Sequence, residues 1–272
     1  MEQAAKAAHF LELHHRDTPL LLPNPWDPGS AKLFASIGFQ ALATTSSGHA
    51  ATLGRLDGGV TRDEALGHAA IIVTATALPV SADLEKGFAD DPAGVAETVR
   101  RAVEVGLAGC SIEDFTARED APIYDAELAA DRVAAAAEAA HAGPVHLTLT
   151  ARTENYLHGR PDLADTIARL RSFQEMGADV LYAPGLTEVG DIRAVVEAVD
   201  LPVNVLALPG APNVQELAAV GVKRISVGSG FSLVGLAAIA EAASEFLNEG
   251  TYRFWQTAAA GVEARDTAFS QS

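Results

Sequence analysis

The chain has only one cysteine, Cys110, among its 272 residues, which excludes an intrachain disulfide and a zinc site built from several cysteines. Basic residues are also scarce: 19 Lys and Arg face 36 Asp and Glu, and the formal net charge is −17 at pH 7. Nucleic acid is therefore not an expected partner, because phosphate binding needs a basic face. Small anionic substrates are not excluded, since a few local cations and a metal can outweigh the overall charge.

Long apolar runs are a further absence. Residues 1–16 carry Lys, Glu and His in an amphipathic helical pattern without the apolar core of a signal peptide, and no run is long enough to span a membrane. We expect a soluble, cytoplasmic protein with no membrane partner. The hydrophobic share of 49% is enough to fill the core of one barrel-sized domain.

Apolar β-type runs alternate with Ala-rich helical runs from end to end. The predicted strands are Leu20–Pro23, Ala41–Thr44, Pro79–Ser81, Gly109–Glu113, Val145–Ala151, Val180–Ala183, Val203–Leu206 and Arg224–Val227. The predicted helices are Gly29–Ser36, Thr61–Ala77, Ala93–Val105, Asp125–Ala140, Asp162–Met176, Glu188–Val199, Val214–Ala219 and Phe231–Leu247. Strands that are apolar throughout indicate burial on both faces. Eight such βα units predict an α/β fold, a (β/α)8 TIM barrel, and a doubly wound sheet is the alternative.

Acidic residues end two of these strands. Asp83 and Glu85 follow the third strand, and Glu113 ends the fourth. A carboxylate at the tip of a buried strand is costly unless a cation meets it. Oxygen ligands alone suit Mg²⁺ or Mn²⁺ rather than Zn²⁺. The alternative is that these acids cap the helices that follow.

In a barrel, the chemistry belongs at the carboxyl ends of the strands. Polar residues at or just after these ends form the candidate rim: Trp26, Ser46, Ser47, Gly48, His49, Asp57, Asp83, Glu85, Glu113, Asp114, Arg152, Glu154 and Asn204. This set is richer in polar groups than packing requires.

Five short motifs in this order carry a family resemblance. They are Ser46-Ser47-Gly48, Leu56-Asp57, Ala82-Asp83-Leu84-Glu85-Lys86-Gly87, Ile112-Glu113-Asp114 and Ala151-Arg152-Thr153-Glu154. On these residues the chain resembles the isocitrate lyase/phosphoenolpyruvate mutase superfamily over nearly its whole length.

The resemblance implies a single barrel domain over residues 1–272, with a helix over 231–247 that swaps between partners and a C-terminal tail over 250–272. It implies homodimers that pair into homotetramers. It also implies Mg²⁺, or Mn²⁺, held directly by Asp83 and largely through water by Glu85 and Glu113. The family motif has Asp where this chain has Glu85, so one ligand is longer by a methylene.

Physical chemistry supplies a role for each part of this rim. A 2-oxo acid can chelate the metal through its ketone and one carboxylate oxygen, so that negative charge on the ketone is stabilised as an enolate develops. The Ser46–Gly48 turn would donate to the substrate carboxylate, and Arg152 would supply a fixed positive charge beside it. By the resemblance, Asp57 lies next to the metal's water network.

Further rim residues have candidate roles, and some of them have a second interpretation. His49 could donate a proton to an enolate or orient a carboxylate, and it could equally be a loop histidine bonded to backbone. Trp26 could stack on the substrate or pack in the core. Asn204 at a strand tip is a candidate substrate amide, and Arg152 with Glu154 could form a structural ion pair.

The loop after the fourth strand differs from the family pattern. Residues 115–124 contain neither the cysteine nor the histidine of the true lyases' Lys-Lys/Arg-Cys-Gly-His motif, and they lack the phosphonate enzymes' lysine. The loop is a candidate lid. We therefore predict a Mg²⁺-dependent lyase that cleaves or decarboxylates a small 2-oxo acid or 2-hydroxy di- or tricarboxylate through a metal-stabilised enolate. The alternatives are C–P chemistry on phosphonopyruvate and a non-catalytic 2-oxo-acid-binding protein.

Overall fold

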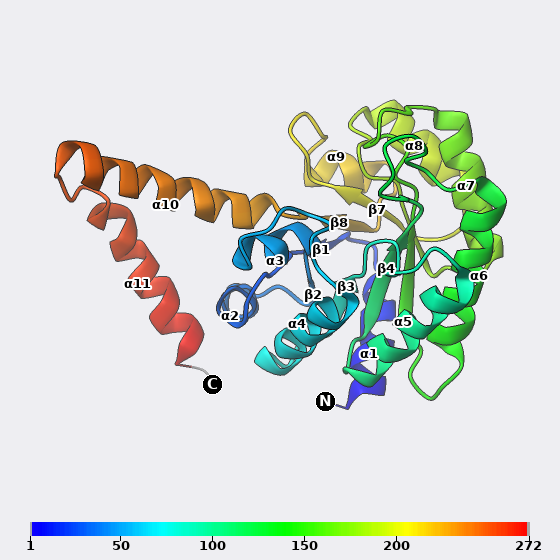
Figure 1. Ribbon diagram of the computed structural model, residues 1–272, viewed down its shortest axis with the longest axis horizontal. Helices are drawn as coiled ribbons and strands as arrows, with labels where there is room; N and C mark the ends of the chain where they lie inside the picture. The colour runs from blue at the N-terminus through cyan, green and yellow to red at the C-terminus, as the bar shows by residue number, and fades with distance from the viewer. Residues whose placement is uncertain (1, 271–272) are drawn as a thin grey trace.

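Eight parallel strands surround the core of the computed structural model, which describes residues 2–270 (Figure 1). Their order in the sheet is β1-β8-β7-β6-β5-β4-β3-β2, so each strand lies beside a sequence neighbour and β8 returns to β1. The strands are β1 Leu20–Leu22, β2 Leu42–Ala43, β3 Val80–Asp83, β4 Gly109–Glu113, β5 Thr148–Arg152, β6 Val180–Tyr182, β7 Val203–Leu206 and β8 Arg224–Ser226. The predicted (β/α)8 barrel is confirmed, and each predicted strand overlaps an observed one.

Helices follow the strands around the outside of this barrel (Figure 1). They are α1 Gln3–Leu13, α2 Pro28–Ile37, α3 Ser46–Thr52, α4 Arg62–Ala75, α5 Pro92–Glu104, α6 Ala126–His141, α7 Leu163–Glu175, α8 Val189–Ala198, α9 Val214–Ala219, α10 Gly230–Glu249 and α11 Trp255–Phe269. Capping side chains set several starts. Thr61 and Glu64 form a capping box at α4, and Asp91 accepts from the backbone N–H of Gly94 at the start of α5.

Burial along β4 and β5 explains why polar groups gather at one end of the barrel. In each strand the first four residues are buried and the last, Glu113 or Arg152, is partly exposed. The two final residues are register partners. The apolar strand bodies thus build the core, and their last positions deliver charged side chains to the carboxyl-end rim.

Helix α1 closes the opposite end of the barrel. Phe10 and Leu13 are buried there together with Leu20 and Leu22 of β1. Gly109, the first residue of β4, has no side chain, and a Cβ atom at this position would lie 2.6 Å from the Phe10 ring. The amphipathic N-terminal helix predicted from the sequence is therefore the floor of the barrel.

One seam in the barrel has little backbone pairing. Among the described residues, β1 and β2 share no strand ladder, and the Ala43 N–H donates across the gap to the Pro23 carbonyl at 3.1 Å. Asn24 reinforces this place from the end of β1. Its side-chain oxygen accepts from the N–H groups of Val227 and Gly228 at 3.1 and 2.9 Å, and its amide donates to the Thr44 carbonyl at 3.0 Å.

Helix α10 leaves the barrel after β8 and projects from it, and α11 turns back towards α2, which it contacts (Figure 1). Large apolar side chains on α10 are exposed, among them Val234 at 65% and Ile239 at 67%. Of the helices within residues 2–270, α10 is long and apolar enough to cross a membrane by length and composition, which corrects the expectation that no such segment exists. Its length of 20 residues exceeds the range 231–247 predicted for it.

Two helical segments were not predicted. Ser46–Gly48 was expected as a turn but forms the first turn of α3, with Thr45 as its N-cap. The segment 250–272, expected only as a tail, contains the 15-residue helix α11.

Candidate functional site

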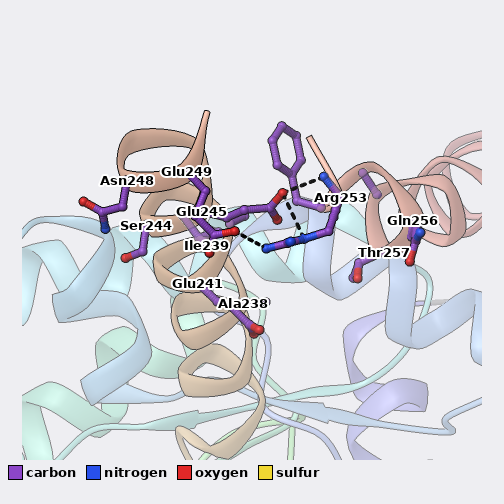
Figure 2. Close-up of a pocket in the computed structure, with 13 residues that line it drawn as sticks. Ala238, Ile239, Glu241, Ser244, Glu245, Asn248, Glu249, Arg253, Gln256 and Thr257 are labelled. Atoms are coloured by element: carbon purple, nitrogen blue, oxygen red, sulfur yellow. Dashed lines mark hydrogen bonds and ion pairs between the residues drawn. The ribbon is translucent and has the colours of Figure 1, made fainter. Parts of the chain in front are cut away.

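A hollow of about 710 Å³ lies between α10 and α11, away from the strand ends (Figure 2). Its prominent cation, Arg253, forms ion pairs with Glu245 at 3.6 Å and with Glu249 at 2.5 Å. Helix α10 projects from the barrel and α11 turns back towards α2, so this hollow lies between the two helices and outside the barrel (Figure 1). None of the polar residues at the strand ends lines this hollow.

A smaller cavity of about 230 Å³ lies inside the barrel at the carboxyl ends of the strands. Its walls come from most of the strands and from the loops that follow them. The lining residues that carry polar side chains are Asn24, Thr44, Thr45, Ser46, Ser47, Asp57, Ser81, Asp83, Ser111, Arg152, Tyr182, Arg224, Ser226 and Ser229. Ser46, Ser47, Asp57, Asp83 and Arg152, all expected on the rim, meet here.

Asp83 holds two neighbours of this cavity through its two carboxylate oxygens. Its Oδ1 accepts from Arg152 Nη1 at 3.0 Å, and its Oδ2 accepts from the Ser46 hydroxyl at 2.9 Å. The Ser46 backbone N–H points to the same Oδ2 at 3.4 Å. The first turn of α3 therefore directs its donors to a carboxylate of the protein.

Arg152 is the centre of the charge network. Besides Asp83, it contacts Glu113 at 3.2 Å and Glu154 at 2.7 Å, and it lies 5.1 Å from the centre of the Tyr182 ring. Burial alone would lower the pKa of Arg152, but Glu154, Glu113 and Asp83 raise it well above its usual value. Arg152 is therefore a permanent cation, fixed in orientation by three carboxylates.

A second layer fixes Glu154 in turn. Its backbone N–H donates to Asp114 Oδ1 at 2.8 Å, and Asp114 Oδ2 accepts from Arg169 at 3.2 Å. The side chain of Asp114 is 2% exposed and that of Arg169 is 11% exposed, so this pair is largely shielded from water. The Arg152–Glu154 pair belongs to the rim cluster and has structural support of its own.

Glu85 lies beside Asp83 on a strained turn. Its backbone φ is +49°, a left-handed value that a residue with a side chain adopts at a cost. It lines a narrow extension of about 10 Å³ that shares Ser46 and Asp83 with the main cavity. Burial, followed by repulsion from Asp83 and Asp57, raises the pKa of Glu85 from 4.5 to about 7.

Glu113 completes the expected set of ligands without lining the cavity itself. Its side chain is 10% exposed and rests against Arg152. Burial raises its pKa well above the usual value, although Arg152 opposes this shift. Asp83, Glu85 and Glu113 have one guanidinium nearby, that of Arg152, so ionising all three carboxyl groups would need a further cation. All the ligand atoms they offer are oxygens. This donor set fits Mg²⁺ or Mn²⁺.

Four of the expected substrate-side residues lie outside the cavity lining. Trp26 packs edge-on against Phe34, with ring centres 6.2 Å apart, and its carbonyl oxygen lies 2.9 Å from His68. Gly48 is buried and its N–H bonds to the cap Thr45 at 3.2 Å. Trp26 thus takes the packing role that the sequence left open. Gly48, expected as a donor to the substrate, has its N–H directed to the helix cap instead.

Asn204 and His49 are the other two. The Asn204 side chain bridges Ser226 at 3.0 Å and Arg224 at 2.9 Å, so it acts beneath the cavity through two residues that line it. His49 lies in the narrow extension with Glu85 and stacks on His68, with ring centres 3.9 Å apart. Within the described residues neither ring nitrogen of His49 has a hydrogen-bond partner, and burial lowers its pKa.

Arg224 is a cavity residue that the sequence analysis missed. It is 4% exposed and bonds only to neutral groups within the described part of the chain: Asn204, Thr150 at 3.0 Å and His14 at 3.3 Å. Burial lowers its pKa to about 10, which leaves it charged at neutral pH. The one available signal was an arginine at the first position of an otherwise apolar strand, where a buried cation is rare.

The candidate lid has a closed base. Phe115 and Ile123 form an antiparallel bridge, and the Thr116 N–H donates to the Pro122 carbonyl at 2.8 Å. Residues 117–120 form the exposed tip, and none of residues 115–124 lines the cavity in this conformation. The loop is therefore a short hairpin-like flap standing beside the cavity.

Comparison with known proteins adds a family. The family model described as phosphoenolpyruvate phosphomutase matches residues 10–247. Among curated proteins, 2-methylisocitrate lyase of Escherichia coli K12 is 30% identical over 196 residues, which is 69% of this chain and 65% of that protein. Oxaloacetate decarboxylase 2 of Pseudomonas fluorescens is 27% identical over 245 residues, 87% of this chain and 82% of its own length.

Solved structures agree with this comparison. A crystal structure from Burkholderia cenocepacia J2315, described only by class as lyase or mutase, is 52% identical with a TM-score of 0.91 and covers 93% of this chain and 92% of its own. A structure of 2,3-dimethylmalate lyase is 26% identical with a TM-score of 0.83, and the match covers 91% of this chain and 89% of that one. The similarity extends over nearly the whole barrel.

Proposed function

The chain belongs to the isocitrate lyase/phosphoenolpyruvate mutase superfamily, and on that premise we propose that it is a Mg²⁺- or Mn²⁺-dependent carbon–carbon lyase. Its substrate would be a small 2-oxo acid or a 2-hydroxy di- or tricarboxylate. The observation that carries this proposal is Arg152, fixed among Asp83, Glu113 and Glu154 at the mouth of the barrel cavity. The named relatives act, by their names, on small carboxylates.

Asp83, Glu85 and Glu113 would hold the cation. When bound, the cation supplies positive charge at the substrate's ketone oxygen and so favours the enolate form. Asp83 offers its oxygens at the cavity wall, and Glu85 reaches the same place from the strained turn behind it. Burial is the main cause of the raised pKa values of Glu85 and Glu113, and nearby carboxylates add to it. A cation bound here would offset the cost of ionising these two carboxyl groups, which supports the assignment.

The remaining residues would bind and orient the substrate. Arg152 donates through a rigid planar fork, which suits a carboxylate. Its Nη1, which now donates to Asp83, would be available to the substrate if Asp83 held the cation. Ser47 contributes a hydroxyl at the cavity wall, and Asp57 faces the cavity from the loop after α3. Tyr182 covers the guanidinium face and excludes water from it.

Arg224 at the cavity floor supports an anionic substrate with a second charge. Its three hydrogen-bond partners are neutral. A buried cation without a counter-ion is costly, and a bound anion offsets that cost. We therefore favour a dicarboxylate such as oxaloacetate: the bond from C3 to the C4 carboxylate breaks, its electron pair moves towards the ketone, CO₂ leaves, and C3 takes up a proton.

The test is proton exchange followed by NMR in D₂O, with pyruvate, oxaloacetate and 2-oxoglutarate, each with Mg²⁺ or with EDTA. We expect Mg²⁺-dependent deuteration at C3, or loss of oxaloacetate faster than with Mg²⁺ alone. Binding of a 2-oxo acid with neither result would overturn the lyase and support a binding protein.

The second candidate is C–P chemistry, favoured by the match of residues 10–247 to the phosphoenolpyruvate phosphomutase model. Phosphonopyruvate is the probe for this alternative. Release of phosphate, or formation of phosphoenolpyruvate, would favour it over the lyase. Because the flap carries no lysine, histidine or cysteine, we rank it second.

We also propose that α10 packs against a second copy of this chain, as a swapped helix of a homodimer or homotetramer. Exposed apolar side chains along α10 support this, because water would otherwise cover Val234, Ile239 and Leu247. The hollow beside it would then be filled by the partner (Figure 2). A soluble, cytoplasmic location without a membrane partner accords with covering this helix by protein.

A further inference from the structure

A second cluster of ligating side chains lies at the opposite end of the barrel from the cavity. It consists of His141 at the end of α6, His146 before β5 and Asp179 before β6. His141 Nε2 lies 3.0 Å from Asp179 Oδ2, and His146 Nε2 lies 2.9 Å from Asp179 Oδ1. Strands β5 and β6 begin beside the cluster and end at the cavity, so the two places are separated by the length of a strand.

The carboxylate of this cluster is held in place by the sheet. Asp179 Oδ2 also accepts from the Leu149 N–H at 2.7 Å, while the Asp179 N–H donates to the Leu149 carbonyl at 2.9 Å. Burial raises the pKa of Asp179, but its bonds to His141, Leu149 and His146 outweigh this and lower it. The group is therefore an oriented anion at neutral pH.

The two imidazoles are parallel and reachable from solvent. Their ring centres are 4.0 Å apart with 6° between the planes. The side chain of His141 is 28% exposed, that of His146 44%, and that of Asp179 13%. The three ligand atoms lie within 4.8 Å of one another. An ion could reach them from the His146 side without opening the barrel.

The donor set identifies the class of ion. Two imidazole nitrogens and one carboxylate oxygen suit Zn²⁺ and related borderline cations, whereas Mg²⁺ and Ca²⁺ prefer oxygens alone. Bond lengths of about 2.0–2.1 Å put the ligand atoms of a tetrahedral site roughly 3.3 Å apart. The observed nitrogen–oxygen distances are 3.0 Å for His141 and 2.9 Å for His146. Each histidine nitrogen would therefore have to move away from the Asp179 oxygen by a few tenths of an ångström to bind the ion.

We propose that His141, His146 and Asp179 bind one divalent cation of the Zn²⁺ class, with water completing its shell. Each Nε2 gives up its hydrogen to solvent and each Nδ1 takes one, so both imidazoles stay neutral. The ion joins the end of α6 to the starts of β5 and β6. It stabilises the folded barrel and takes no part in the reaction at the cavity.

The experiment titrates Co²⁺ into EDTA-stripped full-length protein in excess Mg²⁺, which occupies oxygen sites. We expect one equivalent of Co²⁺ to give visible d–d absorption typical of nitrogen ligation, and Zn²⁺ to displace it and raise the Tm. His146→Gln, at the exposed edge of the cluster, should weaken Co²⁺ binding at least tenfold, and Asp179→Asn should do the same.

Asp83→Asn is the matched control, since it alters the cavity and leaves the cluster intact. It should leave the Co²⁺ titration unchanged. Loss of Co²⁺ binding in Asp83→Asn but not in His146→Gln would place the ion in the cavity and overturn the proposal. So would the absence of binding to the wild type at millimolar Co²⁺. Either result leaves the lyase proposal standing, because that proposal is tested by Mg²⁺-dependent turnover.

Discussion

Arg224 Nη1 meets His14 Nε2 at 3.3 Å across the floor of the barrel, although 210 residues separate them in the chain. His14 Nδ1 lies 2.8 Å from the Phe10 carbonyl and donates to it, which leaves Nε2 as the acceptor for the arginine. His14 is therefore neutral in the folded protein. The contact connects helix α1 to the cation beneath the cavity.

The first prediction concerns pH. Burial, followed by the charge of Arg224, lowers the pKa of His14 from 6.5 to about 3. Between these values the unfolded chain binds a proton that the folded protein does not, so the free energy of unfolding rises with pH through this window and falls as pH drops towards 3. Urea unfolding measured across this pH window should show that the free energy of unfolding rises less steeply with pH in His14→Asn than in the wild type. Identical slopes in the two proteins would contradict the shift, since the carboxyl groups are common to both.

Replacement of Arg224 tests the charge at the cavity floor. Arg224→Met should raise the KM for oxaloacetate about tenfold or more, because a charged hydrogen bond contributes roughly 1.5–3 kcal/mol. Proton exchange in monoanionic pyruvate should change less. Arg171→Met removes the same charge from the surface and serves as the control. An equal loss for both substrates would assign Arg224 a structural role.

Asp83→Asn should abolish metal-dependent turnover, lowering it at least about a hundredfold, while the barrel stays folded. The amide keeps the size of the side chain, and Arg152 retains Glu113 and Glu154 as partners. Turnover with Mg²⁺ and circular dichroism on the same sample measure both effects. An unchanged rate would remove Asp83 from the metal site.

Glu85→Asp restores the residue that the family motif carries. We expect Mn²⁺ affinity within about tenfold of the wild type, since Asp enters the left-handed backbone region more readily than Glu. Glu85→Ala should bind Mn²⁺ much more weakly. Calorimetric titration of Mn²⁺ into the wild type, Glu85→Asp and Glu85→Ala measures these affinities. An equal loss of Mn²⁺ affinity in both variants would show that the longer side chain of Glu85 is required.

Ile239→Asp should convert the proposed oligomer into monomers, because it places a charge on the exposed apolar surface of α10. Light scattering after size exclusion gives the mass. Ile71→Asp, at a 52% exposed site on α4, is the matched control and should leave the assembly unchanged. A monomeric wild type would remove the swapped-helix proposal.

The sequence predicts the barrel well because its strands are apolar throughout and its breaks carry glycine. The motifs around Asp83 and Arg152 also place five expected residues in one cavity, since parallel strands bring their carboxyl ends together. The same logic fails for Trp26 and Gly48. Being close to a strand end in the chain does not decide whether a side chain turns to the cavity or to the core.

Long-range contacts lay beyond sequence reasoning. Arg224, at the start of a strand, looks like a bottom-end residue, and only its long side chain and its contacts with His14, Thr150 and Asn204 bring it under the cavity. The cluster of His141, His146 and Asp179 likewise joins separate segments at the ends of a helix and two strands. Neither the contacts of Arg224 nor this cluster is indicated by a repeating pattern in the local sequence.

The seam between β1 and β2 has a consequence for the order in which the barrel folds. Strand β1 pairs with β8, with Leu20 opposite Arg224. During synthesis, the first strand is therefore the last to gain its ladder partner. Strands β2 to β7 can pair with neighbours as they emerge. The N-terminal strand therefore closes the barrel late, and a nascent chain cut before β8 would leave β1 without a strand to pair with.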